Sequence, residues 1–140
     1  MGPESIFNKV KEILSGISYI EVIYDGDRPS NFRGSFPNIT LEIISNTTEE
    51  LEENNQKINL FRMMIAGAIL VDDFNKQIVG DETFKGILDV ERDIKNALYA
   101  YFPDLDGNCL YFSLSTVSYS VLESGNGRVV FIQGDFYYRE

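Results

Sequence analysis

The stretch from Asp81 to Pro103 constrains the fold most, because it is the clearest amphipathic helix in the chain and separates two blocks of strand-like sequence. Its apolar residues recur at the spacing of one side of an α-helix, and Val90 widens that side. They are Phe84, Ile87, Leu88, Ile94, Ala97, Leu98, Tyr101 and Phe102. We expect Asp81 or Thr83 to cap the helix and Pro103 to end it, because a residue before proline avoids the helical region. A helix of this kind must lie on an apolar surface, which the flanking strands supply.

The chain before this helix predicts a short helix, Ser5–Leu14, followed by three strands. The strands are Tyr19–Tyr24, Phe36–Ser45 and Lys57–Val71. The last is far longer than the usual strand of about five to six residues. We therefore expect its beginning to outrun the sheet and to form a protruding hairpin with the end of the strand before it. A polar, acidic connector, Asn46–Asn55, joins the two.

Alternating apolar and polar residues indicate which faces of two strands are buried. In Phe36–Ser45 the apolar set alternates with a polar set. The apolar set is Ile39, Leu41 and Ile43, and the polar set is Asn38, Thr40 and Glu42. In a later strand, Leu110–Leu122, the apolar positions switch parity near Ser115–Thr116. One added residue explains the switch, so we expect a β-bulge or a bend there.

A strong turn signal, Asn126-Gly127, precedes the last strand, Val129–Tyr138. The resulting order of elements is α-β-β-β-α-β-β. This order predicts a single α+β domain over residues 1–140, with a mostly antiparallel sheet of about five strands and two helices packed on one face. We find no internal repeat and no linker that would divide the chain.

Composition excludes several classes of function. The net charge is −10, and a nucleic-acid-binding face needs clustered lysine and arginine, so we expect no specific nucleic-acid binding. The chain has no histidine, which removes the commonest general base and most zinc sites. Its single cysteine, Cys109, lies beside Leu110 and Tyr111, which favours a buried and unreactive thiol. No apolar run reaches the roughly 18 residues of a membrane span, so we expect no membrane partner.

Two stretches of the chain contain clustered acidic residues that could form a metal site. The stretch Asp104–Asn108 resembles the start of a calcium loop, but the spacing of its glycine and the residue at position 12 do not fit that pattern. Asp72, Asp73, Asp81 and Glu82 could supply oxygen ligands, yet acidic residues also favour helix N-termini for electrostatic reasons alone. We expect no metal, no cofactor and no catalytic residue, and therefore a protein that is not an enzyme.

The acidic connector offers a different kind of site, because a long charged loop in a compact domain is often functional. Its glutamates, together with the following lysine, are the candidate interaction residues. They are Glu49, Glu50, Glu52, Glu53 and Lys57. The alternative is a solvated loop with no partner. The closing aromatic run, Phe131 with Phe136–Tyr138, is most simply explained by core packing and cross-strand pairing.

At this point the layout resembles small tail proteins of long-tailed bacteriophages and prophages, of the tail terminator or tail-completion type. Several stretches spread along the chain carry this resemblance, together with the helix at the N-terminus and the acidic connector before a long strand. They are Phe36-Pro37-Asn38-Ile39, the run Gly86-Ile87-Leu88-Asp89-Val90 continuing through Asp93-Ile94 to Leu98, and Tyr137-Tyr138-Arg139.

The resemblance implies an α/β fold that assembles into a ring, commonly of six copies, which caps the tail tube and stops its growth. It also implies tail-tube and head–tail connector proteins as partners, and a place in the virion tail after assembly in the host cytoplasm. No catalytic residue carries over. The alternative functions are a head–tail joining protein, or a small acidic module that covers a basic partner as an inhibitor or immunity protein does.

Overall fold

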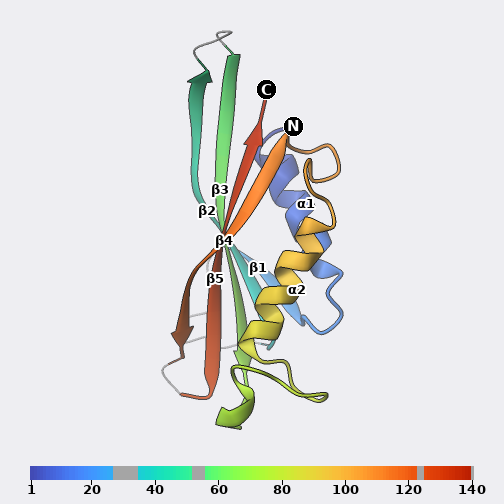
Figure 1. Cartoon of the computed structure of the whole chain (residues 1–140), viewed down its shortest axis with the longest axis vertical. Helices are drawn as coiled ribbons and strands as arrows, with labels where there is room; N and C mark the ends of the chain where they lie inside the picture. The colour runs from blue at the N-terminus through green and yellow to red at the C-terminus, as the bar shows by residue number, and fades with distance from the viewer. Residues whose placement is uncertain (27–34, 52–55, 123–124, 140) are drawn as a thin grey trace.

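The computed structural model describes residues 1–26, 35–51, 56–122 and 125–139 (Figure 1). Within these residues the order of elements is α-β-β-β-α-β-β, as the sequence predicts, with one additional 3₁₀ turn. The elements are α1 (Pro3–Ser15), β1 (Val22–Asp25), β2 (Asn38–Leu51), β3 (Gln56–Leu70), the 3₁₀ turn η2 (Phe74–Lys76), α2 (Ile87–Tyr99), β4 (Tyr111–Val121) and β5 (Gly127–Tyr138).

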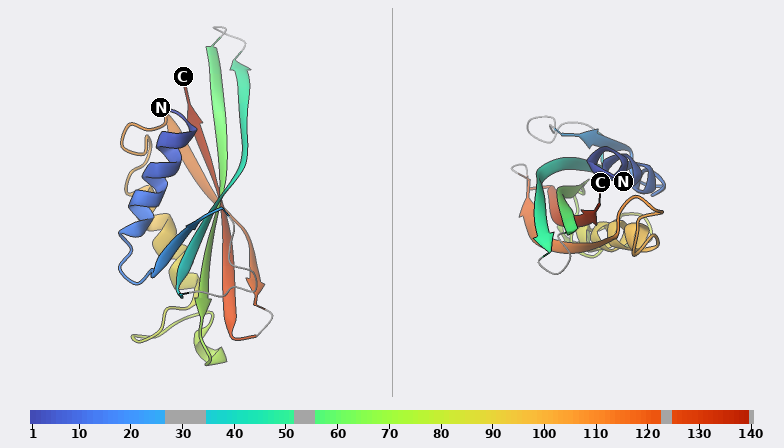
Figure 2. Two further views of the ribbon diagram at one scale, coloured as in Figure 1. Left: turned by 180° about the vertical axis from the view of Figure 1, so that it is seen from behind. Right: turned by 90° about the horizontal axis from the view of Figure 1, so that it is seen from above.

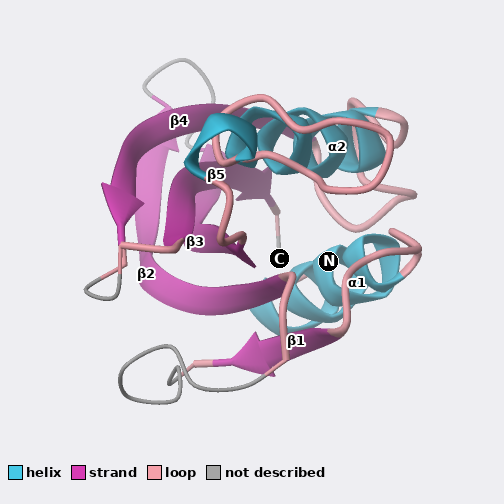
Figure 3. Ribbon diagram, turned by 90° about the horizontal axis from the view of Figure 1, so that it is seen from below, coloured by secondary structure: helices cyan, strands magenta, loops and turns pink. Residues whose placement is uncertain are grey.

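The strands form one five-stranded sheet in the order β1-β2-β3-β5-β4. β1 runs parallel to β2, and the other three pairs are antiparallel, so the sheet is mixed but largely antiparallel, as expected. The sheet is strongly twisted, and both helices lie side by side on one of its faces (Figures 2 and 3). This order leaves β1 and β4 as the two edge strands.

The core fills the space between the helices and the sheet. α1 contributes Ile6, Val10 and Leu14, and α2 contributes Ile87, Val90, Ile94 and Leu98; all are buried. Gly67 of β3 lets α2 lie close to the sheet. A Cβ atom there would lie 2.7 Å from Val90 Cγ1 and 3.0 Å from Ile94 Cδ1. The absence of a side chain at Gly67 thus sets the distance between helix and sheet.

The boundaries and buried face expected for α2 were partly wrong. The helix begins at Ile87, because the Asp81 carboxylate instead accepts the amides of Thr83 and Phe84 within a separate turn. Asp89 Oδ2 accepts the Gly86 amide at the true start of the helix. The helix ends at Tyr99, four residues before the expected proline, because the amides of Tyr101 and Phe102 bond three residues back in a tighter turn. Val90 is central to the buried face, whereas several expected members are exposed. Those members are Phe84, Leu88, Tyr101 and Phe102.

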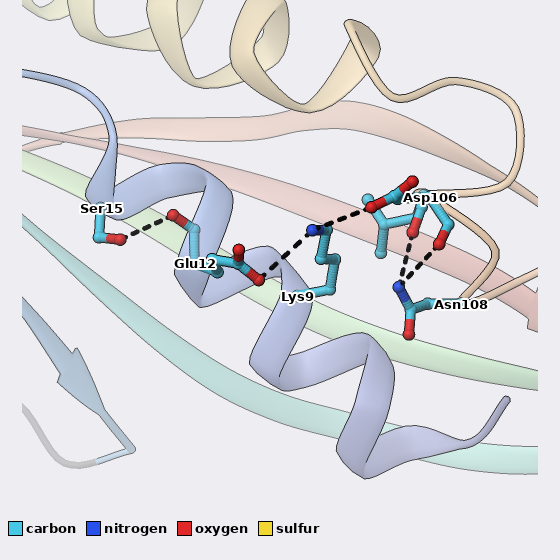
Figure 4. Close-up of polar contacts among 6 residues, drawn as sticks. Lys9, Glu12, Ser15, Asp106 and Asn108 are labelled. Carbon is cyan, nitrogen blue, oxygen red and sulfur yellow. Dashed lines mark hydrogen bonds and ion pairs between the residues drawn. The ribbon is translucent and has the colours of Figure 1, made fainter.

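The turns after α2 hold the two helices together (Figure 4). Lys9 Nζ of α1 lies 3.2 Å from Asp106 Oδ2 and 3.3 Å from Glu12 Oε2. The Asn108 amide donates to the carbonyl of Leu105 at 2.8 Å, and Leu105 is buried. The stretch considered as a calcium loop is therefore a turn whose acidic residue pairs with a lysine.

The acidic connector is shorter than the sequence suggested, because β2 continues to Leu51. Only residues 52–55 remain between β2 and β3, and they lie outside the described part of the chain. β3 extends over Gln56–Leu70 and confirms the single long strand. Backbone pairing with β3, from Ile43 opposite Met63 to Leu51 opposite Gln56, outweighs the weak strand propensity of the acidic residues.

The alternation expected in β2 holds for only part of the strand. Ile39 and Leu41 are fully buried, but Ile43 is 63% exposed because it lies beyond most of α1. Asn38 and Thr40 are buried although they point to the face without helices. Phe36 and Leu122 pack on that face beside Ala66 and close it locally. The expected bulge in β4 is confirmed by a register shift between Thr116 and Ser118.

Candidate interaction surface

β2 and β3 extend beyond the rest of the sheet as an arm, visible at the top of Figure 1. Their pairing continues to Leu51 opposite Gln56, whereas β5 accompanies β3 only as far as Asn59. The tip of the arm is therefore a two-stranded ribbon without a third strand. Ribbons of this kind are marginally stable in water without further support, so an additional contact would stabilise the arm.

Two hydrogen bonds fix the base of the arm to the body. The Tyr138 hydroxyl of β5 donates to Asn46 Oδ1 at 3.0 Å, and the Thr48 hydroxyl donates to Asn59 Oδ1 at 2.6 Å. Tyr138 and Asn59 are themselves buried. The arm thus projects in a defined direction.

The outer edge of β2 has no neighbouring strand in the described residues from Glu42 onward, because β1 pairs only with residues 38–41. The exposed side chains along this edge include Ile43, Ile44 and Glu49. We call Glu42–Leu51 the arm edge. It combines backbone groups available for pairing, two exposed isoleucines and acidic residues.

The structure describes three of the five candidate interaction residues to some extent. Glu49 is exposed on the arm edge, and Lys57 lies opposite Glu50 in the β2–β3 register. Burial raises the pKa of Tyr137, with smaller contributions from Tyr111, Asp135 and Glu49. Glu52 and Glu53 lie outside the described residues. The structure thus places the described candidates on the arm, without showing a partner for it.

The opposite edge of the sheet is β4, whose eleven residues include no charged side chain and no proline. Natural edge strands are usually blunted by such residues. Its first half is covered by aromatic side chains. Tyr99 stacks on Phe112 at 5.6 Å between ring centroids, and Phe102 meets Phe112 edge-on at 5.7 Å. The Tyr99 hydroxyl also bonds the backbone of Leu114. The second half lacks this cover.

Three exposed side chains of the second half of β4, together with exposed Ile78 and with exposed Leu88 at the start of α2, form a set that we call the β4 flank. They are Ile78, Leu88, Val117, Tyr119 and Val121. The three β4 residues are 55%, 50% and 53% exposed, respectively.

Two hydrogen bonds involve residues of the β4 flank. The Tyr119 hydroxyl donates to the Glu91 carboxylate, one helical turn from Leu88. The Leu88 amide donates to the carbonyl of Ile78 at 3.1 Å. The sequence patterns did not predict this surface, although the lack of charge between Tyr111 and Val121 could have indicated it.

Three of the four acidic residues considered for metal binding are engaged by a lysine or by nearby donors, and the fourth, Glu82, is exposed. Lys76 Nζ lies 2.8 Å from Asp81 and 3.9 Å from Asp73. The Lys76 hydrogen bond and the amides of Phe84 and Thr83 lower the pKa of Asp81 to about 2. Asp72 accepts from the Asn126 amide at 3.1 Å. Among the described residues no group of three acidic or cysteine side chains could hold a metal ion.

Cys109 is buried, as expected, and burial with a smaller effect of Asp104 raises the pKa of its thiol to about 12. Neither helix in the described part of the chain has the length and hydropathy of a membrane-spanning segment.

No protein-family model matches the chain, and no curated protein matches it at a significant level. The function must therefore be argued from the surfaces described above.

Proposed function

We propose that this protein is a virion assembly protein of a long-tailed phage or prophage, of the tail terminator type, which forms a ring on the end of the tail tube. The observation that carries the proposal is the combination of a projecting arm with two open sheet edges on opposite sides of one small domain. Two different surfaces that pair with each other make a heterologous contact, which is the contact that builds rings. The sequence resemblance to tail terminators points to the same role.

The experiment uses the purified chain and a tail-tube protein from the same phage or prophage genome. Tube protein is allowed to polymerise with and without the chain, and tube lengths are measured by electron microscopy. A terminator binds one end of each tube and stops elongation, so the tubes become shorter as the chain is added. Tubes of unchanged length with no density at either end would overturn the proposal.

A second candidate, an acidic inhibitor or immunity-type module, is favoured by the exposed carboxylate of Glu49 on a projecting element. Replacing the four glutamates proposed from the sequence of the acidic connector with glutamine separates the two functions. They are Glu49, Glu50, Glu52 and Glu53. An inhibitor of a basic partner would lose association rate and salt sensitivity. A ring that depends on main-chain pairing would assemble almost as before.

A further inference from the structure

We infer that the arm edge, Glu42–Leu51, of one copy pairs as an added strand with the β4 flank of a second copy. This inference rests on the proposed function, and it deepens it by naming the two surfaces that join successive subunits. The acceptor begins after Leu114, the residue whose backbone groups are bonded to Tyr99.

Backbone geometry supports the β4 end of this contact. The Leu114 amide and carbonyl are both engaged by Tyr99, at 3.0 Å and 3.4 Å, so an added strand cannot bond there. Beyond it, from Ser115 to Val121, the order of the sheet gives β4 no second neighbouring strand in the described residues. An edge of this length without lysine or proline is a template for another strand.

Exposed apolar side chains on both surfaces also support the arm edge of a second copy as the occupant. The arm edge carries Ile43 and Ile44, and the β4 flank carries Val117 and Val121, so both surfaces would bury apolar area that is now exposed. β-Branched side chains such as these pack well against their neighbours on a pleated sheet.

The distribution of charge also favours β4 as the surface that accepts the arm edge. The arm edge contains Glu42, Glu49 and Glu50, and the whole chain has a net charge of −10. Most surfaces of a second, equally acidic copy would repel the arm edge, because like charges directly opposite each other destabilise a strand pair. β4 has no carboxylate. The nearest carboxylate in the described residues is Glu91 of α2, which accepts from Tyr119, and Lys95 lies 3.9 Å from it and balances its charge.

The contact also explains the arm itself. Beyond Asn59 the arm has only two strands, and an added neighbour would supply the third strand that the chain does not provide. The arm edge and the β4 flank lie at opposite sides of the same sheet, so each copy can donate and accept at once. Such a contact propagates from copy to copy and can close into a ring.

Cysteine cross-linking tests the contact directly. Thr47→Cys places a thiol on the arm edge, and Ser118→Cys places one on β4; both residues are exposed on the face of the sheet away from the helices. The double variant, treated with a short bis-maleimide, is expected to give a ladder of covalent dimers, trimers and larger species. Each single variant is expected to remain monomeric on a denaturing gel.

Three results would overturn the inference or separate it from the proposed function. Efficient dimers from Ser118→Cys alone would mean that two β4 edges pair with each other, which contradicts it. Rings seen by native mass spectrometry without a ladder from the double variant would also contradict it, while leaving the proposed function standing. A ladder from a protein that does not shorten tail tubes would support the contact and overturn the proposed function.

A lysine substitution provides the second measurement. Val117→Lys blunts the acceptor edge in the way natural edge strands are blunted, and should weaken self-association by at least about tenfold. The matched control is Ser113→Lys, on the covered half of the same strand, which should change self-association less than about twofold. Equal effects of the two variants, at unchanged melting temperature, would contradict the assignment of the acceptor to the second half of β4.

Discussion

The Tyr99 hydroxyl accepts a hydrogen bond from the Leu114 amide at 3.0 Å and lies 3.4 Å from the Leu114 carbonyl, to which it donates. One side chain at the end of α2 thus serves both main-chain groups of an edge-strand residue. This contact divides β4 into a covered half and an open half, and so determines where another strand can be added.

Removing this hydroxyl should open the covered half of β4. Tyr99→Phe keeps the stacked ring but leaves the Leu114 amide without its acceptor, so we expect a loss of about 1 kcal/mol in unfolding free energy. Hydrogen exchange followed by NMR should show faster exchange at Leu114. Tyr101→Phe is the control, because the structure gives the Tyr101 hydroxyl no hydrogen bond within the described residues. Unchanged protection of Leu114 would show that the hydroxyl does not hold this edge.

The packing of α2 on β3 gives a second prediction. Gly67→Ala would place a methyl group 2.7 Å from Val90 Cγ1, and overpacking of this kind costs about 1–3 kcal/mol. Urea denaturation measures the loss. Val90→Ala removes the closest clashing methyl group, so the double variant should be less destabilised than the sum of the two single changes. If the losses in unfolding free energy of the two single variants add up to that of the double variant, the added methyl group is accommodated by movement of α2 away from the sheet and does not clash with Val90.

Periodicity in the sequence was sufficient to predict the fold class, the order of elements and the long strand that became β3. These features depend on local patterns that burial on one face imposes. The bulge near Thr116 was also predictable, because one added residue reverses the alternation of side chains. The start of α2 could not be predicted, because Asp81 offers as plausible a capping residue in the sequence as Asp89, which bonds the Gly86 amide in the structure.

The candidate site was predicted only in part. The acidic residues near Glu49 indicated an interaction surface, but the strand they belong to could not be extended to Leu51 from propensity, because pairing with β3 decides it. The β4 flank was missed altogether. Whether Val117 and Val121 are buried depends on which strands α2 covers, and the strand order is a property of the whole sheet.

Lowering the pH should destabilise the start of α2, because it protonates the Asp89 carboxylate. Burial alone would raise the pKa of Asp89, but hydrogen bonds from Gly86 and Gly80 and the charge of Arg92 outweigh it, so the pKa lies below its ordinary value. Its stabilising contribution is therefore complete above the unfolded-state pKa of about 3.9 and is lost as the pH falls through the folded-state pKa. Asp89→Asn should lower the unfolding free energy at pH 7 by about 1.5 kcal/mol.

Denaturant titrations from pH 7 to pH 2 distinguish this effect from general acid unfolding. The difference between wild type and Asp89→Asn should shrink as the pH falls below about 4. Glu82→Gln, an exposed residue in the preceding loop, is the control and should change little at any pH. A difference that stays constant down to pH 2 would show that the charge of Asp89 does not stabilise the helix start.

Cys109 should be unreactive in the folded protein. Its thiol is buried, and with a pKa raised to about 12 only about one part in ten thousand is thiolate at pH 8. Ellman's reagent at pH 8 should therefore label no thiol in native protein and one thiol per chain in guanidinium chloride. The introduced thiol of Ser118→Cys, on the exposed edge, should react within minutes and serves as the control. Rapid labelling of the native wild-type chain would mean that the turn before β4 opens readily, and cross-linking would then require replacement of Cys109.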